Sequence, residues 1–271
     1  MNVFDMLIST PLGYIISFIY SFVQNYGFTI ILFTIVVKIL LAPLMVKQQK
    51  SMVQMQKLQP ELQKLQKKYA NDKDRLNQET VKLYQDHKVN PAGGCLPLLI
   101  QLPIIIGLYN VIQSPVKYIM HIGAENIQKI IKLIGFTGKD QIGLATAMAE
   151  NTELILEKLS ISFNPINFEF FGLNLADKPE FSTFNLLWII PALSALTAYI
   201  SSYVSAKISG NTQQNEQMKS MNIVMPLMSA YFCFILPAGV GLYWIMSNVM
   251  QMILQCIITV IIKKKEENTN A

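Results

Sequence analysis

Long apolar segments are the feature that most restricts how this 271-residue chain can fold. A bilayer core about 30 Å thick needs about 20 mostly apolar residues per helix. Five segments meet that requirement, at residues 28–46, 96–117, 184–206, 222–238 and 239–262. Charged residues make up 14% of the chain, well below the value of about 25% in soluble domains. The sequence therefore predicts an all-α integral membrane protein with five transmembrane helices.

The ends of these segments carry further signals. Pro237, Ala238 and Gly239 separate the last two, and because proline cannot continue a helix we expect a tight helical hairpin there. Near the amino terminus, residues 11–23 are apolar but short. We interpret residues 1–27 as an amino-terminal interfacial helix, with an uncleaved signal segment as the alternative.

Basic residues indicate the orientation, because basic loops are retained in the cytoplasm. Residues 47–88 hold ten Lys or Arg against five acidic residues, whereas residues 118–182 hold five against eight. We therefore expect the amino terminus and the 118–183 segment outside, with 47–95, 207–221 and the basic tail 263–271 in the cytoplasm. The net charge of +5 then reflects retention and lipid head-group attraction, and gives no argument for nucleic acid binding.

The 47–95 segment predicts a cytoplasmic antiparallel helical hairpin. Its first helix shows apolar residues at spacings of three and four, and a shorter stripe follows from Leu76. Pro60 lies inside the first helix, where it either kinks the helix or begins a new first turn. An inert solubilising insertion is one interpretation; we favour substrate or partner binding, because the connection is longer than two spans need. The residues assigned to that contact are Met52, Met55, Leu58 and Leu62.

The segment expected outside, residues 118–183, carries fewer sequence signals. One amphipathic stretch runs through residues 127–134, and a polar region follows it. We expect a surface-lying helix and a loop there, with no recognisable catalytic grouping.

Lys38 is the most unusual residue within the spans. It lies near the middle of the first one, where a basic side chain costs about 2.5 to 3.5 kcal/mol. Snorkelling to the interface is one explanation, although a four-carbon stem only partly covers the distance. The other explanation, which we favour, is that Lys38 faces water inside the protein.

Polar side chains on the other spans support a hydrated interior. Serines and threonines there are explained by hydrogen bonds between packed helices. Lys38 is not explained in this way, because no span contains an Asp or Glu to pair with it. We therefore predict a hydrated cavity with a fixed positive charge, lined by Lys38, Thr34, Gln101, Trp244, Asn248 and Gln251.

The sequence gives no sign of an enzyme, a metal site or a cofactor. Both histidines, His87 and His121, lie outside the spans, so no intramembrane proton relay is indicated. The three cysteines show no CxxC spacing. Phosphate-binding, zinc-protease and serine-hydrolase motifs are also missing from the sequence.

Several long blocks resemble the YidC-type membrane protein insertases, bacterial relatives of the mitochondrial oxidase-assembly insertase. The likeness covers about Gly27 to Ile262. The blocks that carry it are LQPELQKLQKKYANDKDRLNQETVKLYQ, NPAGGCLPLLIQLPIIIGLYNVI from Asn90, FFGLNL from Phe170 and LPAGVGLYWIMSNVMQMILQ from Leu236.

This resemblance implies a five-span core with a hydrophilic groove open to the cytoplasm and to lipid. Lys38 falls where that family usually has an arginine, and Thr34 and Trp244 fall at positions associated with the groove and substrate contact. Lysine keeps the charge but loses the planar fork of arginine, so electrostatic attraction survives while bidentate binding of a carboxylate is in doubt. The long basic tail of some relatives is reduced here to KKKEENTNA.

The leading hypothesis is a membrane protein insertase and chaperone in the bacterial cell membrane that acts without nucleotide hydrolysis. Its partners would be nascent membrane proteins, the ribosome and targeting machinery, and the lipid bilayer. An alternative is a small-solute transporter or anion channel that uses Lys38 as its site. A third hypothesis is an assembly partner that only helps spans fold beside the Sec translocon.

Overall fold

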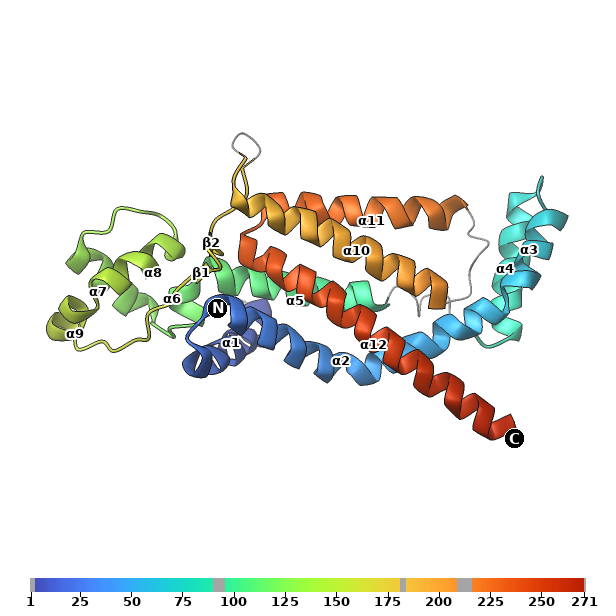
Figure 1. The fold of residues 1–271 in the computed structure, drawn as a ribbon, viewed down its shortest axis with the longest axis horizontal. Helices are drawn as coiled ribbons and strands as arrows, with labels where there is room; N and C mark the ends of the chain where they lie inside the picture. Colours follow the sequence, from blue (N-terminus) through green and yellow to red (C-terminus); the bar gives the residue numbers. More distant parts are fainter. Residues whose placement is uncertain (1–2, 90–95, 181–183, 209–215, 271) are drawn as a thin grey trace.

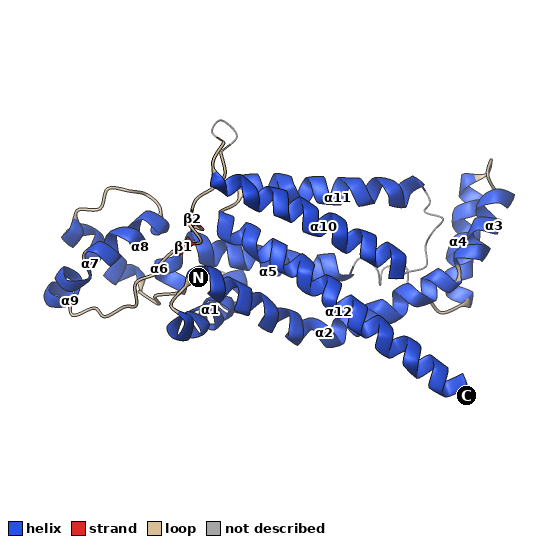
Figure 2. Cartoon of the chain, viewed as in Figure 1, coloured by secondary structure: helices blue, strands red, loops and turns tan. Residues whose placement is uncertain are grey.

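The computed structural model describes residues 3–89, 96–180, 184–208 and 216–270 of the chain. Nearly all of its regular structure is helical, and two short strands form one antiparallel pair (Figure 2). A bundle of long helices occupies the centre, a helical hairpin lies at one end, and a group of short helices lies at the other (Figure 1). The motif residues Asn90 to Cys95 lie outside the described residues.

Five helices correspond to the apolar segments of the sequence. They are α2 (Tyr26–Lys57), α5 (Leu96–Gln113), α10 (Ile189–Ile208), α11 (Glu216–Ile235) and α12 (Ala238–Asn270). Helix α12 packs along both α2 and α10, and α11 packs on α10. Helix α5 contacts α12 and α2 less extensively (Figure 1).

Four helices of the described residues are long and apolar enough to cross a membrane: Asp5–Val23, Tyr26–Met55, Leu186–Ile208 and Ala238–Ile262. Gln101–Gln113 and Val224–Ile235 are shorter apolar helices. The count of five spans therefore stays a prediction, as does the interfacial position of the amino-terminal helix.

Apolar side chains remain exposed on the outer faces of the long helices, as contact with lipid tails requires. Phe28, Leu32 and Ile39 are exposed on α2. Tyr199 on α10 and Leu227 on α11 are exposed in the same way. This distribution fits a membrane protein and would be unusual on a soluble one.

The predicted break between the last two spans is present. Helix α11 ends at Ile235 and α12 begins at Ala238, so Leu236 and Pro237 form the turn, and Ala238 and Gly239, expected in the turn, are the first residues of α12. The first amides of α12 find partners in a distant loop: Ala238 N donates to Asp177 O and Gly239 N to Leu175 O, each at 2.8 Å. These bonds satisfy amides that the helix itself leaves free.

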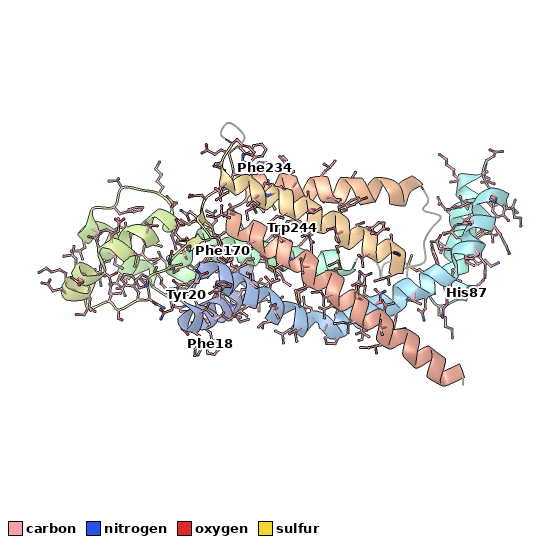
Figure 3. All side chains as sticks on the ribbon, viewed as in Figure 1. Phe18, Tyr20, His87, Phe170, Phe234 and Trp244 are labelled. Carbon is pink, nitrogen blue, oxygen red and sulfur yellow. The ribbon has the colours of Figure 1, made fainter. Side chains whose placement is uncertain are left out.

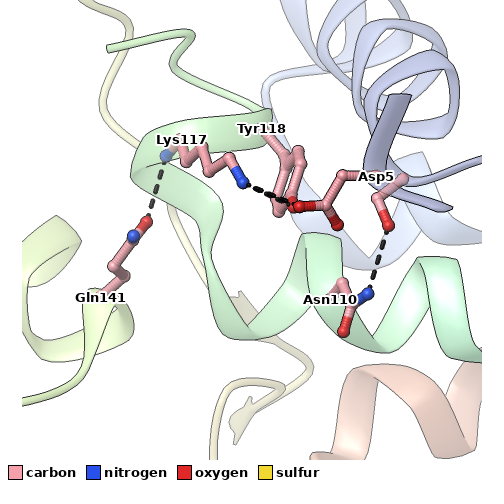
Figure 4. Close-up of polar contacts among 6 residues, drawn as sticks. Asp5, Asn110, Lys117, Tyr118 and Gln141 are labelled. Carbon is pink, nitrogen blue, oxygen red and sulfur yellow. Dashed lines mark hydrogen bonds and ion pairs between the residues drawn. The ribbon is translucent and has the colours of Figure 1, made fainter. Parts of the chain in front are cut away.

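The amino-terminal helix lies within the range predicted for it, residues 1–27. A π-helical turn, η1 (Asp5–Ser9), runs directly into α1 (Thr10–Val23), so the helix begins before the apolar stretch 11–23. The η1 turn packs on α5, and α1 packs on α5 and on α6 (Pro115–Tyr118). Asn110 donates to Ser9, and Lys117 forms an ion pair with Asp5 at 3.3 Å (Figure 4). These polar contacts attach the η1 turn to α5 and α6.

The predicted helical hairpin is formed by α3 (Gln59–Lys68) and α4 (Lys73–Asp86), which pack on each other. Pro60 lies in the first turn of α3, where its missing amide costs no hydrogen bond. The apolar stripe of the sequence is therefore divided: Met52 and Met55 belong to the end of α2, and α3 begins after Leu58. Asp72 caps α4 by accepting from Arg75 N at 3.0 Å.

The 118–183 segment is more helical than a surface helix and a loop. Helix α7 (Ala124–Ile134) matches the predicted amphipathic stretch. Two further helices follow, α8 (Gln141–Glu150) and α9 (Thr152–Leu159), in the region expected to be a loop. Asp140 starts α8 by accepting from Gly143 N, and Leu144 and Met148 are buried. Their short apolar pattern is too brief to stand out in the sequence.

Hydrogen bonds between polar side chains join the spans. Ser194 of α10 pairs with Ser229 of α11, and Gln255 of α12 donates to Ser205 of α10. Gln49 of α2 donates to Thr259 of α12 at 3.2 Å. Pairing between helices accounts for these serines and threonines, since each contact contributes about 0.6 to 2 kcal/mol in a membrane.

Candidate functional site

The structure places Lys38 between three helices. Its side chain extends from α2 and is 5% exposed. The ammonium donates to Oε1 of Gln101 on α5 and to Oε1 of Gln251 on α12, each at 3.5 Å. Both bonds lie at the long limit for such contacts. Among the described residues no carboxylate contacts this ammonium.

Gln101 connects Lys38 to the rest of the cluster. Its Nε2 donates to the hydroxyl of Tyr243 at 2.8 Å and to Oγ of Ser247 at 3.4 Å. Tyr243 is fully buried and Ser247 nearly so. The amide is therefore oriented by α12, and its oxygen is turned toward the ammonium.

Tyr243 and Ser247 are site residues that the sequence analysis missed. They precede Gln251 at intervals of four, so the three share one face of α12. The predicted polar line began instead at Trp244 and Asn248, which lie one position further along the helix. A helical wheel anchored on Gln251 would have found both residues.

The remaining predicted groove residues make other contacts. Thr34 is fully buried, and its hydroxyl donates to Ile30 O of its own helix at 2.7 Å. Asn248 donates to Thr197 of α10 at 3.3 Å. Trp244 is partly buried, and its ring stacks on Phe232 of α11 (Figure 3 labels Trp244 on α12). The structure thus brings together Lys38, Gln101 and Gln251, and directs Asn248 and Trp244 to the α10 and α11 side.

The predicted contact residues of the hairpin divide into two groups. Leu58 and Leu62 are buried, so a partner could reach them only after the hairpin opens. Met55 is half-buried near the end of α2, and the side chain of Met52 lies outside the described set. Met55 is therefore the member of this group that a partner can reach directly.

The chemistry available at this cluster is binding. An ammonium and four neutral hydrogen-bonding side chains can attract an anion or a polar chain segment and hydrogen-bond to it. No group of His, Cys, Asp and Glu within the described ranges could hold a metal ion. The cluster offers a positive charge buried among neutral groups that can exchange partners.

Comparison with known proteins assigns this architecture to a family. A model of the family described as 60Kd inner membrane protein matches residues 18–266. This chain belongs to that family. The matched range includes Lys38, Gln101 and Gln251.

Named members of the family share about a third of the aligned residues with this chain. Membrane protein insertase YidC of Fusobacterium nucleatum is 34% identical over 249 residues, covering 92% of this chain and 93% of the relative. The protein of the same name from Caldanaerobacter subterraneus is 32% identical over 261 residues, covering 92% and 93%. Membrane protein insertase YidC 2 of Listeria innocua is 32% identical over 262 residues, covering 95% and 72%. The resemblance seen in the sequence is confirmed.

A solved family structure supports the fold. The crystal structure of an active YidC insertase with its first transmembrane domain resolved matches with a TM-score of 0.55 and 25% identity. The match covers 93% of this chain and 46% of that protein, so this chain spans about half of its length. The predicted all-α integral membrane fold is confirmed, and the chain is a multi-pass bacterial membrane protein.

Proposed function

We propose that this protein inserts nascent membrane proteins into the bilayer through a hydrophilic groove, without nucleotide hydrolysis. The observation that carries the proposal is the environment of Lys38: a buried ammonium with two long bonds to amide oxygens and no carboxylate partner among the described residues. A cation at that depth is costly unless water or a bound anion meets it. The insertase relatives support the choice of a polypeptide as the substrate.

The long bonds of Lys38 suit an exchange of partners. A carboxylate of an incoming chain would form a charge-assisted bond, which is about twice as strong as a bond to a neutral amide. Gln101 and Gln251 would then turn their amides toward the polar backbone of the substrate. The bound segment is held by charge and hydration, so release requires no covalent step.

Transfer into lipid provides the driving force. The apolar span of the substrate gains about 25 cal/mol for each Å² removed from water. The groove has only to lower the barrier for the polar segment that crosses ahead of it. Nucleotide hydrolysis is unnecessary when the end state is downhill.

The remaining assignments complete the proposal. The amino terminus lies outside and the carboxyl terminus in the cytoplasm, with five spans and an interfacial helix formed by η1 and α1. The hairpin of α3 and α4 receives substrates from the ribosome and targeting machinery. The protein acts alone or with the Sec translocon.

Substitution of Lys38 tests the electrostatic step. We expect Lys38→Arg to keep insertion of substrates with acidic translocated segments, Lys38→Ala to reduce it, and Lys38→Glu to reduce it most, because the new carboxylate repels the segment. The measurement is protease protection of a short membrane protein synthesised on proteoliposomes that contain each purified variant. Full insertion by the Lys38→Glu variant would refute the proposal.

A control substrate separates charge from folding. A substrate whose translocated segment has no acidic residue should be inserted equally well by the wild-type protein and by Lys38→Ala. Equal loss for both substrates would instead mean that the substitution damages the bundle.

A further inference from the structure

The short β-hairpin before α10 has an unusual residue at its tip. Strands β1 (Glu169–Phe170) and β2 (Leu173–Asn174) pair with Phe170 opposite Leu173, which leaves Phe171 and Gly172 as the two-residue turn. Both turn residues have positive φ, 50° at Phe171 and 75° at Gly172. Such turns favour Asn or Asp followed by Gly. A bulky aromatic residue in this conformation is strained, and strain of this kind marks a functional position.

The side chain of Phe171 is also exposed. It is 80% accessible, which is high for a phenylalanine, and the turn itself does not require an aromatic residue. Its ring contacts Phe170 edge-to-face at 4.6 Å and lies 6.2 Å from Phe28 of α2. The hairpin therefore presents an aromatic side chain outward, supported on its inner side by two further rings.

The hairpin is attached firmly to the ends of the spans, so its tip has a fixed position. The Phe170 ring lies against Gly27, where an added Cβ would be 2.1 Å from Cδ2 of that ring. Asn25 donates to Glu169 O at 3.4 Å. The hydroxyl of Tyr20 donates to Pro165 O at 3.0 Å and accepts from Asn167 N at 2.8 Å.

The tip continues an exposed apolar surface of α2. On α2 the exposed large side chains recur at helical spacing and end beside Phe171; they are Leu40, Ile39, Val36, Leu32 and Phe28. Other aromatic residues lie at the same end of the bundle, where Figure 3 labels Phe18, Phe170 and Phe234. Aromatic residues gather where the acyl chains of a bilayer meet its head groups.

We propose that Phe171 is a lipid anchor: the tip of the β-hairpin inserts its ring between phospholipids at the edge of the acyl region, beside the first turn of α2. Continuity with the exposed face of α2 selects phospholipid as the occupant. The backbone amides at the start of α12 bond to Leu175 and Asp177, just after the β-hairpin. The anchor therefore fixes the depth of the β-hairpin and of the start of α12 relative to the edge of the bilayer. This inference does not depend on the proposed insertion activity.

Spin-label accessibility tests the occupant directly. The label is attached at Phe171→Cys in full-length protein whose three cysteines are replaced by Ser, and the protein is placed in phospholipid nanodiscs. The matched control is Leu156→Cys on α9, which is 52% exposed and lies among the short helices away from the spans (Figure 1). Collisions with oxygen report lipid, and collisions with a water-soluble nickel complex report solvent.

The proposal expects oxygen to dominate at position 171 and the nickel complex to dominate at position 156. Nickel collisions at position 171 equal to those at position 156 would overturn it, because the tip would then lie in water. Exclusion of both reagents at position 171 would also overturn it, because a protein surface, and not lipid, would then cover the tip.

Two substitutions at position 171 distinguish the effect of the aromatic ring from the effect of the turn conformation. Phe171→Asn suits the positive φ and preserves the hairpin, so the thermal midpoint in detergent should stay the same or rise. Phe171→Trp keeps an interfacial aromatic residue. In bilayers containing brominated lipid, the Trp variant should show quenched fluorescence beyond that of the parent protein, and unchanged quenching would count against the anchor.

Discussion

Gln101→Glu gives the sharpest test of how the Lys38 cluster works. The substitution keeps the shape of the side chain and replaces the amide by a carboxylate. Because Oε1 of Gln101 already lies 3.5 Å from the ammonium, the new carboxylate would supply the missing ion-pair partner. The hydroxyls of Tyr243 and Ser247 can donate to it in place of accepting.

The magnitude follows from the distance. Two unit charges 3.5 Å apart attract by about 5 kcal/mol at an effective dielectric constant of about 20. Desolvation of the new carboxylate costs several kcal/mol, so the net change in the free energy of unfolding is small. The charge of the cluster nevertheless falls to zero, and a substrate carboxylate is no longer attracted.

Gln255→Glu is the matched control. Gln255 lies one turn beyond Gln251, is 6% exposed and donates to Ser205. A carboxylate there is more deeply buried than one at position 101, which is half-buried, and it lacks the contact to Lys38. Both differences favour Gln101→Glu, so its unfolding free energy should exceed that of Gln255→Glu, and the attraction to Lys38 supplies about 5 kcal/mol of the difference.

Two assays read the result. Thermal unfolding in detergent should place the midpoint of Gln101→Glu above that of Gln255→Glu by on the order of 10 °C. Insertion of a substrate with an acidic translocated segment should fall for Gln101→Glu to the level of Lys38→Ala. Wild-type insertion by Gln101→Glu, with the stability difference present, would refute the claim that a free positive charge drives the step.

Two further predictions concern the packing around the bundle. Gly27→Leu should lower the free energy of unfolding by about 1–3 kcal/mol, and with it the thermal midpoint, because its Cβ would lie 2.1 Å from the Phe170 ring. Gly123→Ala, whose Cβ meets nothing within 4 Å, should lower neither. The ring of His121 stacks on Tyr14 with 4.3 Å between ring centroids, and desolvation lowers the pKa of His121. The folded state therefore keeps its full stability above the ordinary pKa of 6.5 and loses stability relative to the unfolded state as the pH falls below it. Thermal midpoints should therefore fall more steeply on acidification for the wild type than for His121→Asn, and parallel curves would contradict this.

The sequence was most informative where a residue conflicts with its surroundings. Lys38 and Gln101 were predicted as site residues because a charge and an amide within apolar spans need polar partners, and the structure brings them together. Pro237 was placed in the turn between α11 and α12 because proline cannot continue a helix. Local chemistry was sufficient at each of these positions.

Other features depend on contacts that no local pattern records. The predicted first span ends at residue 46, whereas helix α2 continues to Lys57. Hydropathy marks where contact with lipid ends and not where a helix ends. The docking of Leu175 and Asp177 on the first amides of α12 uses backbone atoms, which carry no sequence signal. Tyr243 was missed because tyrosine counts as an aromatic, apolar residue in the sequence pattern, although its hydroxyl accepts a hydrogen bond from Gln101.

Helix α2 connects the Lys38 cluster directly to the hairpin of α3 and α4. Its 32 residues measure about 48 Å at about 1.5 Å per residue, well over the thickness of the acyl region. Lys38 and the α3–α4 hairpin therefore lie on one continuous rod, along which a displacement of the hairpin is transmitted toward the site. Pro43 lies between the two and lacks a backbone amide, so it is the point at which this rod can bend.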